Sequence, residues 1–263
     1  MLKKRLIPKL LIQHRKLGRT TRPVLVTTTR FSASHDVGDP VSQAKIYEAQ
    51  LADELIVLNI DGTPIGDDKL MLELIERLAG ETFMPLAVGG GVRALDDFGL
   101  LLERGADKVS VNTAALDDPD LIGAAANRYG AQCVVVSIDF RTGADGASFV
   151  VRHSARHTTG RTVLDWAKEA ADRGAGEILL CDADRDGGGD GLNWQVCRQI
   201  ADAVPVPVII SGGCGRAEHF TEGFVKGCAE GVAAGTFFCF RDQNPMQTRA
   251  HIRNAGVAIR MET

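Results

Sequence analysis

The first 35 residues of this 263-residue chain contain no Asp or Glu, so this stretch offers no carboxylate that could act as a general acid or base. The same stretch is rich in positive charge, which has two interpretations: a solvated face, or a rim that binds an anion. The sequence leaves both open. The basic side chains are Lys3, Lys4, Arg5, Lys9, Arg15, Lys16, Arg19, Arg22 and Arg30.

The chain also lacks a C-x-x-C pair and an apolar run long enough to cross a membrane. Its six cysteines fall mostly in apolar, strand-like runs, which is typical of reduced, buried thiols in a cytoplasmic protein. The apolar segment 6–12 is interrupted by Pro8 and Lys9 and is too short for a signal peptide. We therefore expect a cytoplasmic protein that does not bind membranes.

The net charge of −4 gives no general attraction to nucleic acid, so an anionic ligand has to be bound by local groups. His153 and His157 are four residues apart, but the residues around them predict strand and loop rather than a helix that presents both rings to one metal. No G-x-G-x-x-G run opens a helix after the first strand. We predict no metal, no cofactor and no nucleic-acid partner.

Residues 104–116 combine a Gly-Ala-Asp turn, a short apolar strand and the pair Asn112-Thr113 ahead of an expected helix. The pattern returns at residues 226–236, where Gly105 corresponds to Gly227 at an offset of 122. This long repeat predicts a duplicated half-domain. Backbone N–H groups and small polar side chains between a strand and a helix form a cradle for phosphate, so we expect two cradles.

Eight apolar, strand-like runs alternate with segments of helical spacing, which predicts a closed parallel (βα)8 barrel, the TIM-barrel fold of the α/β class. Nothing resembles a linker, so we predict one domain over residues 1–263, built from two homologous half-barrels. The functional site would lie at the carboxyl ends of the strands. The expected strands are Arg5–Ile12, Glu54–Ile60, Met84–Val88, Lys108–Val111, Cys133–Ile138, Glu177–Cys181, Val206–Ile210 and Gly231–Ala234.

Two connections, residues 13–39 and 140–160, are unusually long for a compact barrel. Loops of this length are usually substrate lids or partner surfaces. The first of them carries much of the basic charge described above, and the sequence does not decide between the two roles.

Seven short motifs occur in order along the chain: Gly38–Pro40, Val88–Val92, Arg104–Ala115, Val134–Asp139, Arg173–Leu180, Asp184–Gly187 and Ser211–Gly213. With this ordered set the chain resembles the HisF family, the cyclase subunit of imidazole glycerol phosphate synthase, over essentially its whole length. Such a set is highly specific, and the TIM-barrel fold that it implies agrees with the alternation of strands and helices.

The resemblance implies two phosphate sites, which fit the two expected cradles. The first would be formed by Gly91, Asn112 and Thr113. The second would be formed by Gly187, Gly213, Ala234 and Gly235, with Gly212 beside them in the Ser-Gly-Gly run and Asp186 as the residue that positions the ligand. The ligand would be a phosphorylated or otherwise anionic small molecule.

The resemblance also implies a charged ring at the amino-terminal mouth of the barrel, the gate through which ammonia from a HisH-like glutaminase partner enters. The matching positions are Arg5, Glu54, Lys108 and Glu177, each with the sign that the family has. Two bases and two acids inside a barrel must pair to offset their desolvation, so a purely structural salt-bridge cluster is the alternative interpretation.

One departure from the family concerns its general acid and base, two Asp residues at the ends of the first and fifth strands. Asp139 fills the second position and is the implied catalytic residue, but Leu11 stands at the first. The acidic position at the end of the second strand is Asn59, with Asp61 two residues on and expected on the same face. Because loss of a general acid or base costs about 10²–10⁴-fold in rate, we do not expect ordinary cyclase activity.

With this replacement, the opening MLKKRLIP and Phe83-Met-Pro85, the chain more closely resembles the HisF-like paralogues of acetamidino-sugar pathways. That resemblance implies a subunit that works with a HisH-like glutaminase and an ATP-dependent amidotransferase, and supplies ammonia for acetamidino-group formation on a surface-polysaccharide sugar. Two alternatives remain open. One is a genuine cyclase/lyase of histidine biosynthesis, with Asp139 assisted by His14 or Asp61. The other is a non-catalytic barrel that activates the glutaminase.

Overall fold

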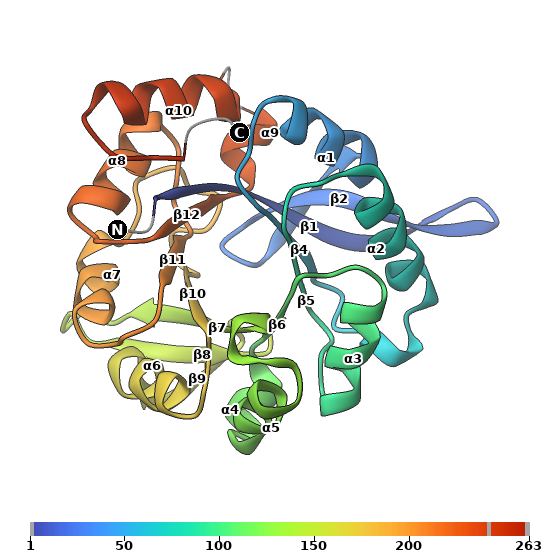
Figure 1. Ribbon diagram of the computed structural model, residues 1–263, viewed down its shortest axis with the longest axis horizontal. Helices are drawn as coiled ribbons and strands as arrows, with labels where there is room; N and C mark the ends of the chain where they lie inside the picture. Colours follow the sequence, from blue (N-terminus) through green and yellow to red (C-terminus); the bar gives the residue numbers. More distant parts are fainter. Residues whose placement is uncertain (1–2, 241–242, 261–263) are drawn as a thin grey trace.

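The computed structural model describes residues 3–240 and 243–260, and eight of its strands form a closed parallel barrel surrounded by helices (Figure 1). The strands follow one another around the barrel in chain order, and β10 closes the circle by pairing with β7. The TIM-barrel prediction is therefore confirmed. The barrel strands are β1 (Arg5–Leu17), β4 (Leu55–Asn59), β5 (Leu86–Gly89), β6 (Lys108–Val111), β7 (Val134–Thr142), β10 (Glu177–Asp182), β11 (Val208–Ser211) and β12 (Gly231–Ala234).

The helices between these strands lie close to the segments of helical spacing, and their apolar sides pack on the outside of the barrel (Figure 1). No helix in the described part of the chain is long and apolar enough to span a membrane. The longer helices are α1 (Pro40–Ala49), α2 (Lys69–Glu81), α3 (Leu95–Glu103), α5 (Asp120–Tyr129), α6 (Val163–Asp172), α7 (Trp194–Ala201), α8 (Ala217–Val225) and α10 (Pro245–Asn254), with short helices α4 (Thr113–Asp117) and α9 (Thr236–Phe240).

Side chains alternate along each barrel strand between the helices outside and the barrel interior, as the pleat requires. On β1, Leu6 and Leu10 belong to the large outer core, whereas Ile7 belongs to a separate interior cluster. That interior cluster is a single apolar layer across the barrel, made of Ile7, Ile56, Ala87, Val135, Leu179, Ile209 and Ala233, with Leu58 against it.

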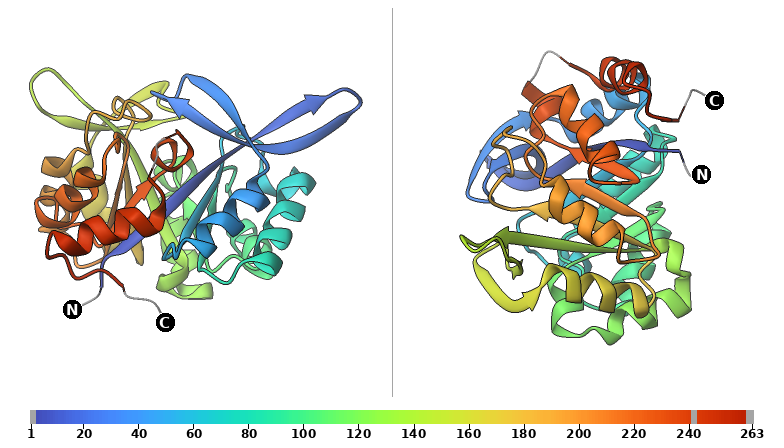
Figure 2. Two further views of the ribbon diagram at one scale, coloured as in Figure 1. Left: turned by 90° about the horizontal axis from the view of Figure 1, so that it is seen from above. Right: turned by 90° about the vertical axis from the view of Figure 1, so that its left-hand side faces the viewer.

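The two long connections are strands rather than irregular loops. The sequence analysis expected a strand just before His153, where β8 lies, but it did not expect strands in the first connection. β1 continues to Leu17 and pairs with antiparallel β2 (Thr20–Thr29), which pairs with β3 (Ala33–Gly38). Likewise β7 extends into a second antiparallel ribbon with β8 (Ser148–Arg152) and β9 (His157–Thr162). Both ribbons project from the carboxyl end of the barrel, away from the end at which β1 begins (Figure 2).

The two halves anchor β4 and β10 to the following helices in the same way. The Asn59 amide donates to Asp68, the N-cap of α2, over 2.8 Å, and the Asn193 amide at the N-cap of α7 donates to Asp182 over 2.8 Å. In the first half the Asn ends the strand and the Asp caps the helix, and in the second half the two residue types change places. Each pair buries one carboxylate and one amide that are hydrogen-bonded to each other.

Glycines at equivalent places let the next strand approach these anchored ends. Gly90 has φ +87°, and a Cβ there would lie 1.9 Å from the Asn59 carbonyl oxygen. Gly212 has φ +89°, and its Cβ would lie 2.5 Å from the Asp182 carbonyl oxygen. Both conditions, the left-handed backbone and the close approach, exclude a side chain at these positions.

Gly90→Ala should therefore destabilise the fold by roughly 3 kcal/mol or more, because strain at positive φ adds to overpacking against β4. Gly62→Ala is the matched control, since Gly62 has φ +75° with nothing within 4 Å of its Cβ, and should cost only about 1–2 kcal/mol. Denaturant unfolding of both variants measures the difference. Equal losses would show that the close approach to Asn59 contributes nothing.

Candidate functional site

The interior-facing side chains of β1 cross the barrel at four successive heights. Arg5 lies at the amino end, Ile7 in the apolar layer, Lys9 above that layer, and Leu11 nearest the carboxyl end. This order follows from the two-residue period of a strand, and it places one side chain of β1 in each part of the site.

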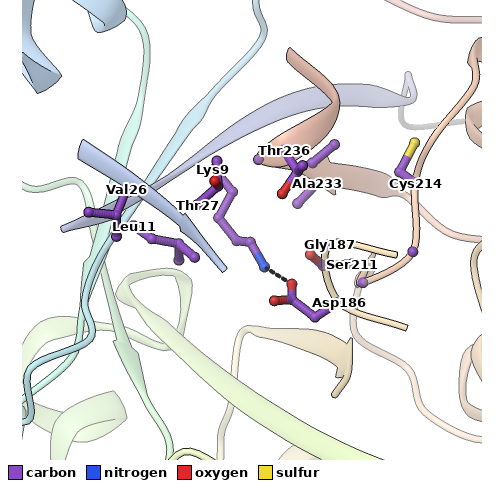
Figure 3. Close-up of a pocket in the computed structure, with 14 residues that line it drawn as sticks. Lys9, Leu11, Val26, Thr27, Asp186, Gly187, Ser211, Cys214, Ala233 and Thr236 are labelled. Carbon is purple, nitrogen blue, oxygen red and sulfur yellow. Dashed lines mark ion pairs between the residues drawn. The ribbon is translucent and has the colours of Figure 1, made fainter. Parts of the chain in front are cut away.

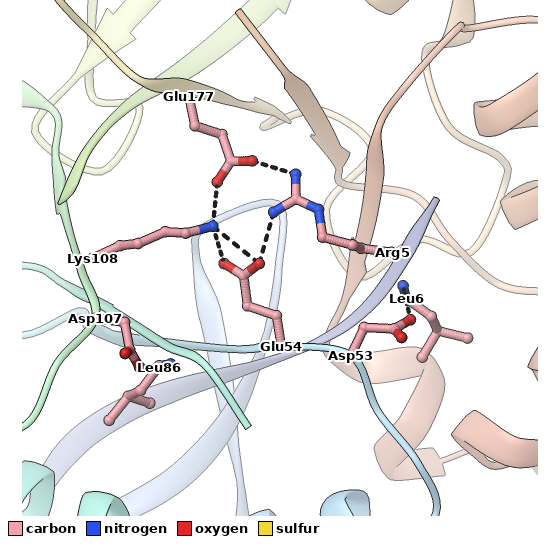
Figure 4. Close-up of polar contacts among 8 residues, drawn as sticks. All are labelled: Arg5, Leu6, Asp53, Glu54, Leu86, Asp107, Lys108 and Glu177. Atoms are coloured by element: carbon pink, nitrogen blue, oxygen red, sulfur yellow. Dashed lines mark hydrogen bonds and ion pairs between the residues drawn. The ribbon is translucent and has the colours of Figure 1, made fainter. Parts of the chain in front are cut away.

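Arg5, Glu54, Lys108 and Glu177 form a closed ring of ion pairs at the amino end (Figure 4). Arg5 Nη1 lies 2.7 Å from Glu54 Oε2, and Lys108 Nζ lies 2.9 Å from both Glu54 Oε1 and Glu177 Oε2. A direct Arg5–Glu177 contact completes the ring. Each base touches both acids, so the four residues that the sequence analysis grouped are brought together.

The ring is almost entirely enclosed: Arg5, Glu54 and Glu177 are buried, and only Lys108 is partly open to solvent. Burying four charges is costly unless every one is compensated, and here two positive charges face two negative charges through short hydrogen bonds. The ring is followed inward by the apolar layer of Ile7 and its neighbours.

A pocket at the carboxyl end brings together every residue expected in the second cradle (Figure 3). Leu11, Val26 and Thr27 form the wall contributed by β1 and β2. The first long connection therefore reaches the site as a strand, β2. The remaining lining residues are Lys9, Asp186, Gly187, Ser211, Gly212, Gly213, Cys214, Ala233, Ala234, Gly235 and Thr236.

β2 is fastened to the loop that carries Asp186. The Thr28 hydroxyl donates to Asp186 Oδ2 over 2.6 Å, and the Arg30 backbone N–H donates to the Asp186 carbonyl over 2.8 Å. Gly187 has φ +69°, and a Cβ there would lie 2.0 Å from the Thr28 carbonyl oxygen. These contacts explain why the glycine is needed and why β2 covers this side of the site.

The residues expected in the first cradle do not line this pocket and have other contacts. The Asn112 amide donates to Asp139 Oδ2 over 2.8 Å. The Thr113 hydroxyl lies 3.5 Å from the His153 backbone N–H in the β8–β9 turn, and the Gly91 carbonyl accepts from the Ile65 backbone N–H over 3.0 Å. Asn112 thus links the first cradle to Asp139.

Asp139 lies on β7 just before this strand leaves the barrel to pair with β8. Burial raises the pKa of Asp139 to about 7; the Lys9 charge and the Asn112 hydrogen bond lower it in part, and nearby Asp186 raises it. A carboxyl group that titrates near neutrality is suited to proton transfer in either direction.

Lys9 is a site residue that the sequence analysis did not single out. Burial favours the neutral amine, but the surrounding acidic groups outweigh burial and raise the pKa of Lys9, so the side chain is an ammonium ion. The sequence could have identified Lys9, because side chains alternate along a strand. Once Arg5 faces the interior, Ile7 and Lys9 must face it as well.

At the end of β4 the Asn59 amide donates to Asp68, and Asp61 binds His14, with His14 Nδ1 2.9 Å from Asp61 Oδ2. His14 also lies 3.2 Å from Asp68 Oδ1. Neither His14 nor Asp61 lines the pocket that Leu11 lines.

Fold and site together define a class: a (βα)8 barrel with a closed ring of charges at its amino end and a glycine-lined pocket at its carboxyl end. The sequence model of the family described as "Histidine biosynthesis protein" matches residues 5–244. The chain belongs to this family, in the group of HisF proteins.

Two relatives are similar over their full length. The provisionally named imidazole glycerol phosphate synthase subunit hisF2 of Prochlorococcus marinus (strain MIT 9313) is 48% identical over 100% of both chains. The imidazole glycerol phosphate synthase subunit HisF of Geobacillus kaustophilus (strain HTA426) is 42% identical over 99% of this chain and 100% of its own.

The raised pKa of Asp139 predicts a pH-dependent stability. Between about pH 4 and pH 7 the folded state holds a proton that the unfolded state releases, so the free energy of unfolding should fall as pH rises through this window. Asp139→Asn should remove this fall, which amounts to at most about 1.4 kcal/mol per pH unit.

Urea unfolding of both proteins at pH 4, 5.5 and 7 measures the difference. The exposed carboxylate of Asp96 provides a control, and Asp96→Asn should keep the fall that the wild type shows. Parallel profiles for the wild type and Asp139→Asn would mean that Asp139 titrates as an ordinary surface carboxyl.

Proposed function

We propose that this chain is a HisF-like synthase subunit that receives ammonia from a HisH-like glutaminase through its barrel and supplies it to a reaction other than imidazole formation. The favoured reaction is acetamidino-group formation on a surface-polysaccharide sugar, together with an ATP-dependent amidotransferase. A phosphorylated or anionic ligand would bind at the glycine-lined pocket.

The observation that carries the proposal is the interior column of β1, which ends in Leu11. The cyclase chemistry of the family uses two carboxyls that face each other across the barrel, and here the first of them is an apolar side chain that lines the pocket. Asp139 has no second carboxylate on β1 with which to divide proton transfer, since β1 carries none.

The amino half of the barrel supports ammonia transfer. The ring of Arg5, Glu54, Lys108 and Glu177 leads directly to the apolar layer, and an uncharged molecule such as ammonia crosses such a layer more easily than an ion does. The chain has the ring but no carboxylate at position 11, and this combination favours delivery of ammonia over the cyclase reaction.

A second candidate is the cyclase subunit of imidazole glycerol phosphate synthase itself. The names of both full-length relatives favour it, as does an Asp139 poised near neutrality. In this alternative Asp139 would carry the proton transfers alone.

Isotope competition tests the delivery. With amide-¹⁵N glutamine, a HisH-like glutaminase from the same genome and excess unlabelled ammonium, the amidinated sugar should carry mostly ¹⁵N. Lys108→Ala should lower the ¹⁵N fraction at least about two-fold while glutamine hydrolysis continues, because loss of the ammonium opens the ring and leaves two buried carboxylates with Arg5 as their one remaining partner in it.

Arg104→Ala provides the control, since Arg104 lies on the same turn and pairs with Glu76 at the surface. Its product should keep the wild-type label. A Lys108→Ala product labelled like the wild type would refute passage through the ring.

A further inference from the structure

The ammonium group of Lys9 is buried in the pocket with few partners for its three N–H donors. Lys9 is 6% exposed, yet Nζ lies 3.6 Å from Asp186 Oδ1 and 3.7 Å from Cys181 Sγ. The first distance is longer than a hydrogen bond, and a thiol sulfur is a weak acceptor. Figure 3 shows the side chain extending toward Asp186 across the pocket.

The other interior lysine is bound quite differently. Lys108 Nζ makes three contacts of 2.9–3.1 Å with the carboxylates of Glu54 and Glu177, although it is the more exposed of the two. A structural lysine in this barrel is thus fully hydrogen-bonded. The donors of Lys9 are left available on the side that faces the pocket.

Ser211 supplies a second unsatisfied group in the same pocket. It is 1% exposed, and its hydroxyl oxygen has no hydrogen-bond partner among residues 3–240 and 243–260. Buried hydroxyls are normally paired, and an unpaired one in a pocket indicates a ligand atom. Ser211 is the last residue of β11 and leads directly into the glycines Gly212 and Gly213 of the second cradle.

We propose that Lys9 and Ser211 form an oxygen-binding subsite beneath the second cradle, where they contact an acceptor oxygen of a phosphorylated ligand. Lys9 is then a specificity-determining residue, and the ligand atom completes the hydrogen bonds that Asp186 and Cys181 leave unmade. The inference rests on the proposed binding of an anionic ligand at the cradle and names the group that lies below it.

The charges in the pocket indicate which kind of oxygen fits. Asp186 lines the pocket and faces the ammonium of Lys9, and the charge of nearby Asp139 acts on the same ammonium, so a further carboxylate would be repelled. A carbonyl oxygen accepts hydrogen bonds and brings neither a charge nor a donor of its own, whereas a hydroxyl brings a donor. The ligand class is therefore a phosphorylated compound with a carbonyl oxygen near its phosphate.

Dihydroxyacetone phosphate and glycerol 3-phosphate are matched probes, because they differ only by a ketone in place of a hydroxyl. Calorimetry on the full chain should show the ketone bound about ten-fold more tightly than the alcohol. The ratio of the two affinities is the quantity to follow. Lys9→Met should reduce this ratio to about one, and Ser211→Ala should lower it a few-fold, while both variants still bind inorganic phosphate. Lys45→Met, an exposed lysine paired with Glu81, should keep the wild-type ratio.

The double variant Lys9→Met/Asp186→Asn separates binding from ion pairing, because it removes Lys9 together with the carboxylate that lies 3.6 Å from it. The proposal requires the ratio to stay near one in the double variant even as the thermal midpoint recovers. If Lys9→Met fails to fold, the double variant alone carries this test. If the affinity ratio of the double variant returned to the wild-type value together with the thermal midpoint, Lys9 would be only the structural partner of Asp186.

Three further outcomes would overturn the proposal: a ratio near one in the wild type, a ratio retained in Lys9→Met, or no binding of any probe to the wild type. Binding of inorganic phosphate distinguishes them. If phosphate binds and the affinity ratio is one, the proposed phosphate site is supported and only the proposed oxygen subsite is wrong. Without phosphate binding, the proposed anionic ligand at the cradle is wrong as well.

Discussion

The hydrogen-bonded register of β1 is the constraint on which the rest of the site depends. β1 pairs with β12 on one side, Arg5 opposite Gly231, and with β4 on the other, Lys9 opposite Ile56. Because interior positions repeat every second residue, this register alone assigns a height in the barrel to each odd-numbered side chain of β1. If the register of β1 slipped by one residue, its interior charged side chains would point outward, into the apolar layer between the barrel and the helices.

Charge compensation differs between the two ends of that column. At the amino end two bases and two acids pair within the protein, each base with both acids. At the carboxyl end Lys9, Asp186 and Asp139 are enclosed but loosely paired, and an orphan hydroxyl lies beside them. Charges that pair within the protein stabilise the fold. Donors that lack a close partner in the protein are suited to binding, because a ligand can supply the missing hydrogen bonds.

The barrel could be predicted from the sequence because its strands are almost purely apolar and its helices amphipathic. Strands β6 and β12 were predicted with the observed bounds. The second cradle was expected from the internal repeat, and the ring of four charges from the resemblance to the HisF family. Strand β8 was expected from its apolar residues, but β3 and β9 were not, because their exposed, polar residues lack the alternation of a half-buried strand. The hydrogen bond from Asn59 to Asp68, the N-cap of α2, was not predicted, because it is a tertiary contact that no local pattern records.

The proposed function requires that Leu11 leaves this barrel without the acid and base pair of a cyclase. The most direct test is turnover of the phosphoribulosyl-formimino precursor of histidine biosynthesis with saturating ammonium, which bypasses any glutaminase. We expect no measurable turnover from the wild type, and a gain of roughly 10²-fold over background from Leu11→Asp but not from Leu11→Asn, which has similar size and no acid. Wild-type turnover at the rate of an ordinary cyclase would contradict the account and identify the chain as a working subunit of imidazole glycerol phosphate synthase.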